Sequence, residues 1–164
     1  MKRSRAARRA CLALIAGFAW ASGATAAEAI KLTSGVYQEQ ETVDASGVRK
    51  LRQVPATVIQ PGSELVYVVN YANVSSKPAN IVITNPMPSE LDYRSASGAV
   101  DGTQSDVSVD GGVSFGALST LRVKGTDGRV RPATAADITH VRWTVPRAVR
   151  PGEQGRVSLR AVVK

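Results

Sequence analysis

Residues 64–72 read ELVYVVNYA, and apolar side chains alternate along this run at Leu65, Tyr67, Val69 and Tyr71. Successive side chains of a strand point to opposite faces of a sheet, so the alternation predicts a strand with one buried face. The same period-two pattern recurs in NIVIT at 80–84, THVRWTV at 139–145 and RVSLRAVV at 156–163. Several such runs predict an all-β protein.

Turn-forming residues separate these runs and divide the chain into strand-length pieces. The segment DASG at 44–47 predicts a hairpin between YQEQETV at 37–43 and VRKLRQV at 48–54. A short helical turn is suggested only by TAAD at 134–137. Further turns are expected at Pro61-Gly62, Asp110-Gly111-Gly112, Asp127-Gly128 and Pro151-Gly152. Short strands with regular turn signals predict an antiparallel sandwich or small barrel in a single domain.

The first 26 residues have the layout of a secretory signal peptide. A basic start with five Lys or Arg residues precedes the apolar run CLALIAGFAW at 11–20. This run is too short to span a hydrocarbon core of about 30 Å. Ala24 and Ala26 occupy the small-residue positions that cleavage requires, which predicts a mature chain starting near Ala27. We therefore expect Sec-type export to the periplasm or the extracellular space.

The composition excludes several classes of function for the mature chain. Cys11 is the only Cys and lies in the leader, so we expect no disulfide, thiolate ligand or cysteine nucleophile after cleavage. The leader holds five of the 21 basic residues, which leaves 16 basic against 13 acidic residues. This small excess does not indicate nucleic-acid binding, which needs a clustered basic surface. No later apolar run reaches transmembrane length, so we expect no membrane-spanning segment in the mature chain.

The run from Pro61 to Gly98, PGSELVYVVNYANVSSKPANIVITNPMPSELDYRSASG, resembles the conserved-repeat domain of unknown function number eleven. The likeness is carried by Pro61-Gly62, Asn73, Pro78-Ala79, NPMPSELDY at 85–93, and Trp143 with Pro151-Gly152. Members of that family are immunoglobulin-like modules of bacterial and archaeal surface proteins. The resemblance covers about residues 58–163 in a single copy. It implies an immunoglobulin-like antiparallel β-sandwich over 58–164 and no particular function. No low-complexity linker separates this part from the N-terminal strand or hairpin segment at 27–57, so we expect one domain, and the sequence does not decide whether residues 28–57 belong to the sandwich.

Side chains suited to catalysis are sparse. His140 is the only His, and its position places it on the outward face of the Trp143 strand beside Arg142. No motif supplies an acid to orient it as a base for a serine. We therefore expect no catalytic residue, no metal site and no cofactor.

Cation binding is an open possibility for one loop. Asp101, Asp106 and Asp110 offer oxygen ligands of the kind that Ca²⁺ prefers. The same residues are also those of a solvated, turn-forming loop. The sequence does not decide whether residues 101–112 bind a cation.

Aromatic residues bear on a carbohydrate-binding alternative, since exposed rings stack on sugars. Trp143 shares its strand face with Val141 and Val145, which predicts that it is a core residue. The same reasoning places Tyr67 and Tyr71 in the interior.

Charge is distributed unevenly along the mature chain. Ten acidic and six basic residues lie between Glu28 and Ser119, whereas three acidic and ten basic residues follow from Thr120. Strand parity places four of these basic side chains outward, and they form the candidate partner-binding basic face: Arg142, Arg156, Arg160 and Lys164. If the last two strands pair, as their short connection PRAVRPGEQG suggests, these side chains form one positive stripe. Such a face either blunts a sheet edge or docks onto an acidic partner or an anionic envelope polymer.

These observations together predict an exported, non-catalytic module for protein binding or structural assembly in the cell envelope. We expect its ligand to be a protein partner or a second copy of the chain. An envelope carbohydrate-binding module is the alternative.

Overall fold

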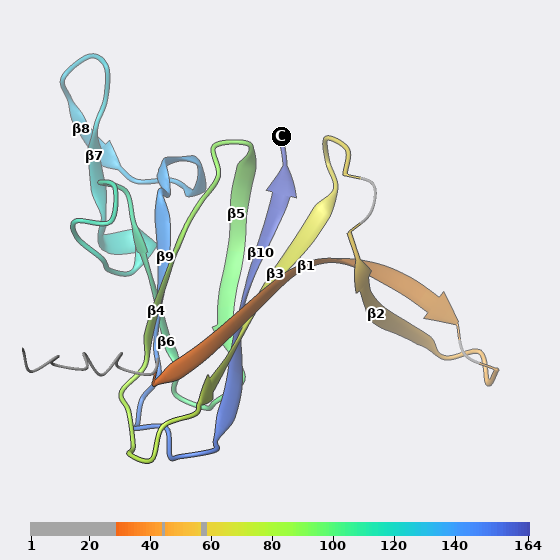
Figure 1. Ribbon diagram of the computed structural model, residues 1–164. Helices are drawn as coiled ribbons and strands as arrows, with labels where there is room; N and C mark the ends of the chain where they lie inside the picture. The colour runs from red at the N-terminus through yellow and green to blue at the C-terminus, as the bar shows by residue number, and fades with distance from the viewer. Residues whose placement is uncertain (1–28, 44, 57–58) are drawn as a thin grey trace, which may run out of the picture.

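The computed structural model describes residues 29–43, 45–56 and 59–164. The predicted signal peptide and the expected mature start at Ala27 lie outside these residues. Strands dominate the described part, which also contains the two short 3₁₀ helices η1 and η2 (Figure 1). The elements are β1 (Ile30–Val43), β2 (Arg49–Pro55), β3 (Glu64–Asn73), β4 (Val82–Pro86), β5 (Leu91–Gly98), β6 (Gln104–Ser108), η1 (Leu118–Thr120), β7 (Arg122–Lys124), β8 (Val130–Pro132), η2 (Ala135–Asp137), β9 (His140–Thr144) and β10 (Gln154–Val163).

Two antiparallel sheets form the body of the molecule. A five-stranded sheet has the order β2-β1-β3-β10-β5, and a three-stranded sheet has the order β4-β9-β6. Strands β7 and β8 form a separate two-stranded ribbon. Every named strand pair is antiparallel. The structure therefore has the all-β, sandwich-like architecture that the alternating sequence pattern predicts.

The core lies between the two sheets. Trp143 on β9 is 1% exposed and belongs to one apolar cluster with Val141, Val157 and Leu159, which come from both sheets. The predicted burial of Trp143, Val141 and Val145 is confirmed. Tyr71 is buried as predicted, and Tyr67 is half-buried against the same cluster.

Strand β3 is buried more completely than its alternation suggests. Val66 and Val68 point away from the apolar cluster, yet they are 3% and 5% exposed. Because β3 lies between β1 and β10 inside the five-stranded sheet, neighbouring strands flank these side chains on both sides.

The expected pairing of the last two strands is wrong. Strand β9 is the centre of the three-stranded sheet, whereas β10 lies in the five-stranded sheet. Their connection crosses the end of the sandwich, where Val149 is buried and exchanges two backbone hydrogen bonds with Ala79 at 2.8 and 3.0 Å. That bridge holds the connection between the two sheets and prevents it from closing a hairpin.

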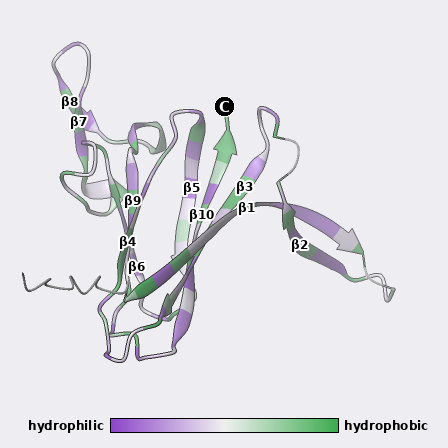
Figure 2. Ribbon diagram, in the orientation of Figure 1, coloured by the Kyte–Doolittle hydropathy of each residue, from purple (hydrophilic) through white to green (hydrophobic). Residues whose placement is uncertain are grey.

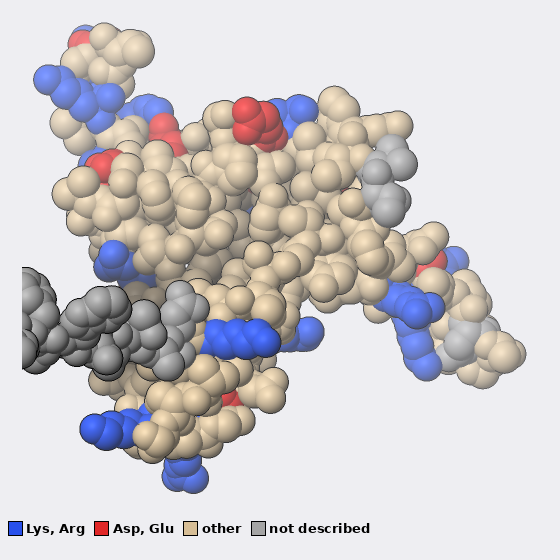
Figure 3. All heavy atoms as spheres, in the orientation of Figure 1, with Lys and Arg blue, Asp and Glu red and all other residues tan. Residues whose placement is uncertain are grey.

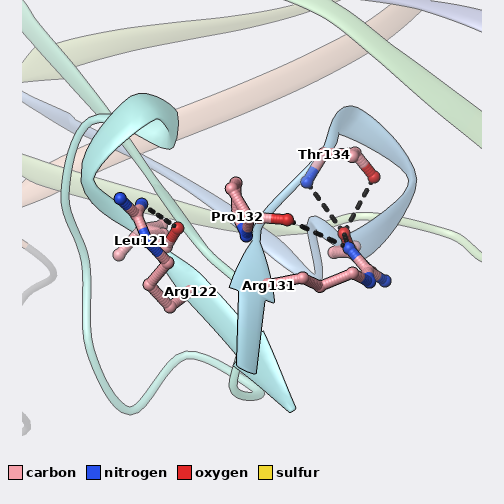
Figure 4. A network of polar contacts seen from close by, with 6 residues as sticks. Leu121, Arg122, Arg131, Pro132 and Thr134 are labelled. Carbon is pink, nitrogen blue, oxygen red and sulfur yellow. Dashed lines mark hydrogen bonds and ion pairs between the residues drawn. The ribbon is translucent and has the colours of Figure 1, made fainter. Parts of the chain in front are cut away.

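The short helical turn expected at 134–137 is present as η2. A capping box forms at its start, because the Asp137 carboxylate accepts hydrogen bonds from the backbone N–H and hydroxyl of Thr134, both at 2.8 Å. Arg131 donates two further bonds of 2.7 Å to the same carboxylate. Figure 4 shows the Arg131 side chain extending toward Thr134 and its hydrogen bond to the Pro132 carbonyl. The bonds between Arg131 and Asp137 join η2 to β8, and η2 also lies beside β5.

Candidate protein-binding edge

Strand β1 divides its pairing between two neighbours. Its first half pairs with β3 and its second half pairs with β2, and Tyr37 is opposite both Val66 and Pro55. The second half of β1 and the whole of β2 therefore project from the sandwich as a two-stranded ribbon (Figure 1). We call residues 38–55 the arm. It contains the hairpin predicted around 44–47, with Gly47 at φ 80° in the turn.

One ion pair anchors the base of the arm. Arg160 on β10 donates two hydrogen bonds of 2.6 Å to the two carboxylate oxygens of Glu39. These bonds lower the pKa of Glu39 below its ordinary value and raise the pKa of Arg160. The buried Val66 lines the same small hollow as both side chains. The pair thus links the arm to the sheet across the intervening strand β3.

The two main sheets end at the edge strands β2, β4, β5 and β6, and the last three of these are short, flanked or partly paired. The edge of β6 is paired at Val107, which exchanges hydrogen bonds of 2.9 and 3.0 Å with Gly116. Strand β5 has η2 packed beside it. Strand β4 is an edge strand of five residues that ends at Pro86. Its last residue, Pro86, lacks a backbone N–H, as does Pro55 at the end of β2, and β4 is two residues shorter than the seven-residue β2.

In the described part of the chain the first half of β1, before Val36, has no partner strand on its outer side, and the fourth edge strand is β2. No strand pairs with its outer side within residues 29–43, 45–56 and 59–164. Six of its seven residues are exposed, including Leu51 at 69%. In native proteins an exposed edge strand is a site at which another chain can pair.

The backbone groups on that open edge can be identified from the ladder. Ala56 N–H donates to the Val36 carbonyl at 3.2 Å, in the register that places Pro55 opposite Tyr37. Hydrogen-bonded residues of an antiparallel ladder alternate with residues whose N–H and C=O point away. The backbone groups of Arg49, Leu51 and Gln53 therefore point toward the open edge.

The arm has a polar surface with separated charge. Arg49, Lys50 and Arg52 lie on β2, which contains no acidic residue, and Glu39 and Glu41 lie on the paired half of β1. Arg49 forms an ion pair with Glu41 at 3.2 Å. Figure 2 shows the distal half of β1 as hydrophilic, and Figure 3 shows Lys and Arg gathered on the arm. The hairpin was predictable from the sequence, as was the possibility that an unpaired strand within residues 28–57 adds to a neighbouring chain, but the sequence did not identify β2 as the strand with the open edge. The basic run RKLR at residues 49–52 is the sequence feature that distinguishes β2 from the acidic strand with which it pairs.

The predicted basic face is not one stripe. Arg142 lies on β9 in the three-stranded sheet, whereas Arg156 and Arg160 lie on β10 in the five-stranded sheet. The prediction of one continuous stripe depended on pairing between β9 and β10, and it is wrong because the two strands lie in different sheets.

Three of the four basic side chains already have partners. Arg142 lies over the Phe115 ring at 3.5 Å from its centroid, and Arg160 is bonded to Glu39. Lys164 Nζ donates to the Ser89 carbonyl at 2.7 Å and lies 3.5 Å from an Asp92 carboxylate oxygen. In the described part of the chain, the Arg156 guanidinium alone among the four lacks a hydrogen bond or ion pair. The separation of the four residues removes the continuous stripe, and a partner-binding role for the individual residues stays a prediction.

The loop that was left open for a cation is held by its own hydrogen bonds. Asp110 accepts bonds from the Ser108 hydroxyl, the Val113 N–H, and both the N–H and hydroxyl of Ser114. These donors hold the pKa of the Asp110 carboxyl far below its usual value. No group of three or more His, Cys, Asp or Glu suited to a metal ion occurs among the residues described.

The remaining candidate residues have structural surroundings. His140 lies on the outward side of β9, with its ring against Gly112 and its Nδ1 3.2 Å from the Thr139 hydroxyl. Trp143 and Tyr71 are buried, and Phe115 lies under Arg142. The part of the chain that the structure covers therefore presents no fully exposed aromatic ring for a sugar.

Comparison with known proteins supplies no family. The sequence matches no family model, and it has no significant match among curated proteins or solved structures. None of the described helices is both long and apolar enough to cross a membrane.

Proposed function

We propose that this chain is an exported, non-catalytic module that binds a protein partner by strand addition at the open edge of β2. An immunoglobulin-like sandwich is the rigid scaffold in this proposal, and the arm is the contact element. The observation that carries it is the projection of β2 beyond β3 with three consecutive outward backbone positions, Arg49, Leu51 and Gln53. Main-chain hydrogen bonds provide affinity in strand addition, and alternate side chains provide specificity.

Site-specific photocrosslinking in the native cell envelope tests this function. A photoreactive residue at Gln53 should give a discrete protein adduct. The adduct should disappear when Leu51→Pro removes an outward N–H, because proline is tolerated on edge strands but cannot donate. It should persist with Leu51→Ala, which retains that N–H. A photoreactive residue at Val82, on the β4 edge, serves as the matched control.

Two results would count against the proposal. An adduct at Val82 and none at Gln53 would move the contact to the three-stranded sheet. An adduct at Gln53 that is equally strong with Leu51→Pro would show a contact that does not use the backbone edge.

A further inference from the structure

We infer that the strand added to β2 is an extended acidic segment of another protein, with carboxylates at alternating positions. This inference rests on the proposed function and specifies the chemistry of its ligand. It is carried by the charges of β2 and by the strand that already pairs with its inner edge.

The half of β1 that pairs with β2 shows which side chains are compatible with pairing to β2. Seven residue pairs join β1 to β2, and the β1 side carries Glu39 and Glu41 two residues apart. Glu41 is opposite Leu51 and reaches diagonally to Arg49 at 3.2 Å. Side chains of a strand are shared between its two neighbours, because both neighbours contact the same two faces of the sheet.

The outer neighbour would meet the same basic side chains. Lys50 and Arg52 lie on one face of β2, where carboxylates two residues apart on an added strand would meet them, and Arg49 lies on the other face; all three are exposed. Cross-strand pairs of opposite charge favour pairing, whereas like charges directly opposite disfavour it. An acidic strand is therefore the complementary ligand for this edge.

A second copy of the chain fits less well. Antiparallel pairing of β2 with another β2 would place Arg and Lys residues against Arg and Lys residues. The acidic half of β1 in a second copy offers only residues 40–43 clear of its own sheet, because Arg160 is bonded to Glu39 at the base. That stretch is shorter than the usual strand of about five to six residues.

A defined peptide tests the inference without knowledge of the natural partner. The probe is a capped synthetic peptide of sequence YQEQETV, identical to residues 37–43, titrated into the exported chain and followed by backbone amide NMR. A neutral peptide, YQQQQTV, and a basic peptide, YQKQKTV, are the matched controls. We expect the acidic peptide to bind about 2- to 30-fold more tightly than the neutral one, from two favourable charge pairs.

The location of binding is read from the amides. The acidic peptide should shift the amides of Arg49, Leu51 and Gln53 and slow their hydrogen exchange. Leu51→Pro should abolish binding and Leu51→Ala should preserve it. If Leu51→Pro disturbs the arm, the binding site is located in the wild-type chain instead, from the slower hydrogen exchange of the outward amides of β2 when the acidic peptide is added.

Each contrary result has a distinct meaning. Equal binding of all three peptides at these amides would retain strand addition and overturn the acidic preference. Failure of every peptide to affect them would overturn both proposals. Binding that releases residues 38–43 from β2 would show exchange with β1 and would also overturn the inference. Self-association of the free chain that the acidic peptide does not compete with would assign the edge to a second copy.

Discussion

Glu39 and Arg160 lie 121 positions apart in the chain, and two hydrogen bonds of 2.6 Å join their side chains. The contact connects the base of the projecting arm to β10. Arg160 is 47% exposed and Glu39 is 15% exposed, so solvent screens the pair only in part. Its position suggests that it sets the orientation of the arm more than the stability of the whole domain.

Removing the Arg160 side chain should loosen the arm without unfolding the protein. In Arg160→Ala we expect faster hydrogen exchange at residues 38–43 and 49–55 and a loss of about 1 kcal/mol or less in the free energy of unfolding. Arg160→Met is the control for lost packing over Val66, because it keeps an apolar stem. Unchanged exchange in Arg160→Ala would show that the ion pair does not anchor the arm.

The anchor should also be sensitive to acid. Hydrogen bonds from Arg160 lower the folded-state pKa of Glu39 below its ordinary value of 4.5. The pair therefore contributes fully above the unfolded-state pKa, and its contribution is lost as the pH falls through the lowered value. We expect arm amides to keep their protection from pH 7 to 5 and to lose it below about pH 4, relative to core amides. Glu39→Gln should remove this difference, and a drop that persists in Glu39→Gln would have another origin.

Trp143 should be the most costly single truncation in the core. Its side chain is 1% exposed, so Trp143→Ala should cost about 3–5 kcal/mol through lost burial and a cavity. Its indole Nε1 is buried without a hydrogen-bond partner in the described structure. Trp143→Phe removes that group and should cost less than the alanine variant. Urea unfolding measures both variants, and a red-shifted native fluorescence spectrum would contradict the buried position.

Asn73 should behave as a polar anchor at one end of the sandwich. It has no exposed surface, and its Nδ2 donates to the carbonyls of Lys77 and Val149, both at 2.8 Å. Its Oδ1 accepts from the N–H and hydroxyl of Ser75. Asn73→Ala should cost about 1–3 kcal/mol, because the carbonyl of the buried Val149 and that of Lys77 lose their donor. Ser75→Ala removes one hydroxyl, which bonds to Asn73 Oδ1 and to the backbone of the exposed Lys77, and should cost about 1 kcal/mol. Equal costs of the two variants in urea would argue against the anchoring role of Asn73.

Processing remains a prediction from the sequence. We expect the exported protein to start near Ala27, because the basic start, short apolar run and small residues at Ala24 and Ala26 fit a cleaved leader. Intact-mass measurement of protein from the periplasm or the medium checks this expectation. A full-length mass in those fractions, or a mass that includes a lipid, would rule out this processing.

Face assignments were predictable because the two-residue period of a strand is a local property. It placed Trp143 inside and Arg156 and Arg160 outside before any partner strand was known, and the structure agrees. The hairpin around 44–47 was likewise predictable, because adjacent segments and a turn sequence are enough to form it.

Pairing between distant strands was decided only by the tertiary structure. The short link between β9 and β10 resembled a hairpin connection, yet the buried bridge between Val149 and Ala79 carries it to the opposite sheet. Sequence alone determined that this chain would form short antiparallel strands with known inner and outer faces. The tertiary structure determined which strands pair, that Arg160 bonds to Glu39, and that the β2 edge stays open, because these depend on contacts between segments that are far apart in the chain.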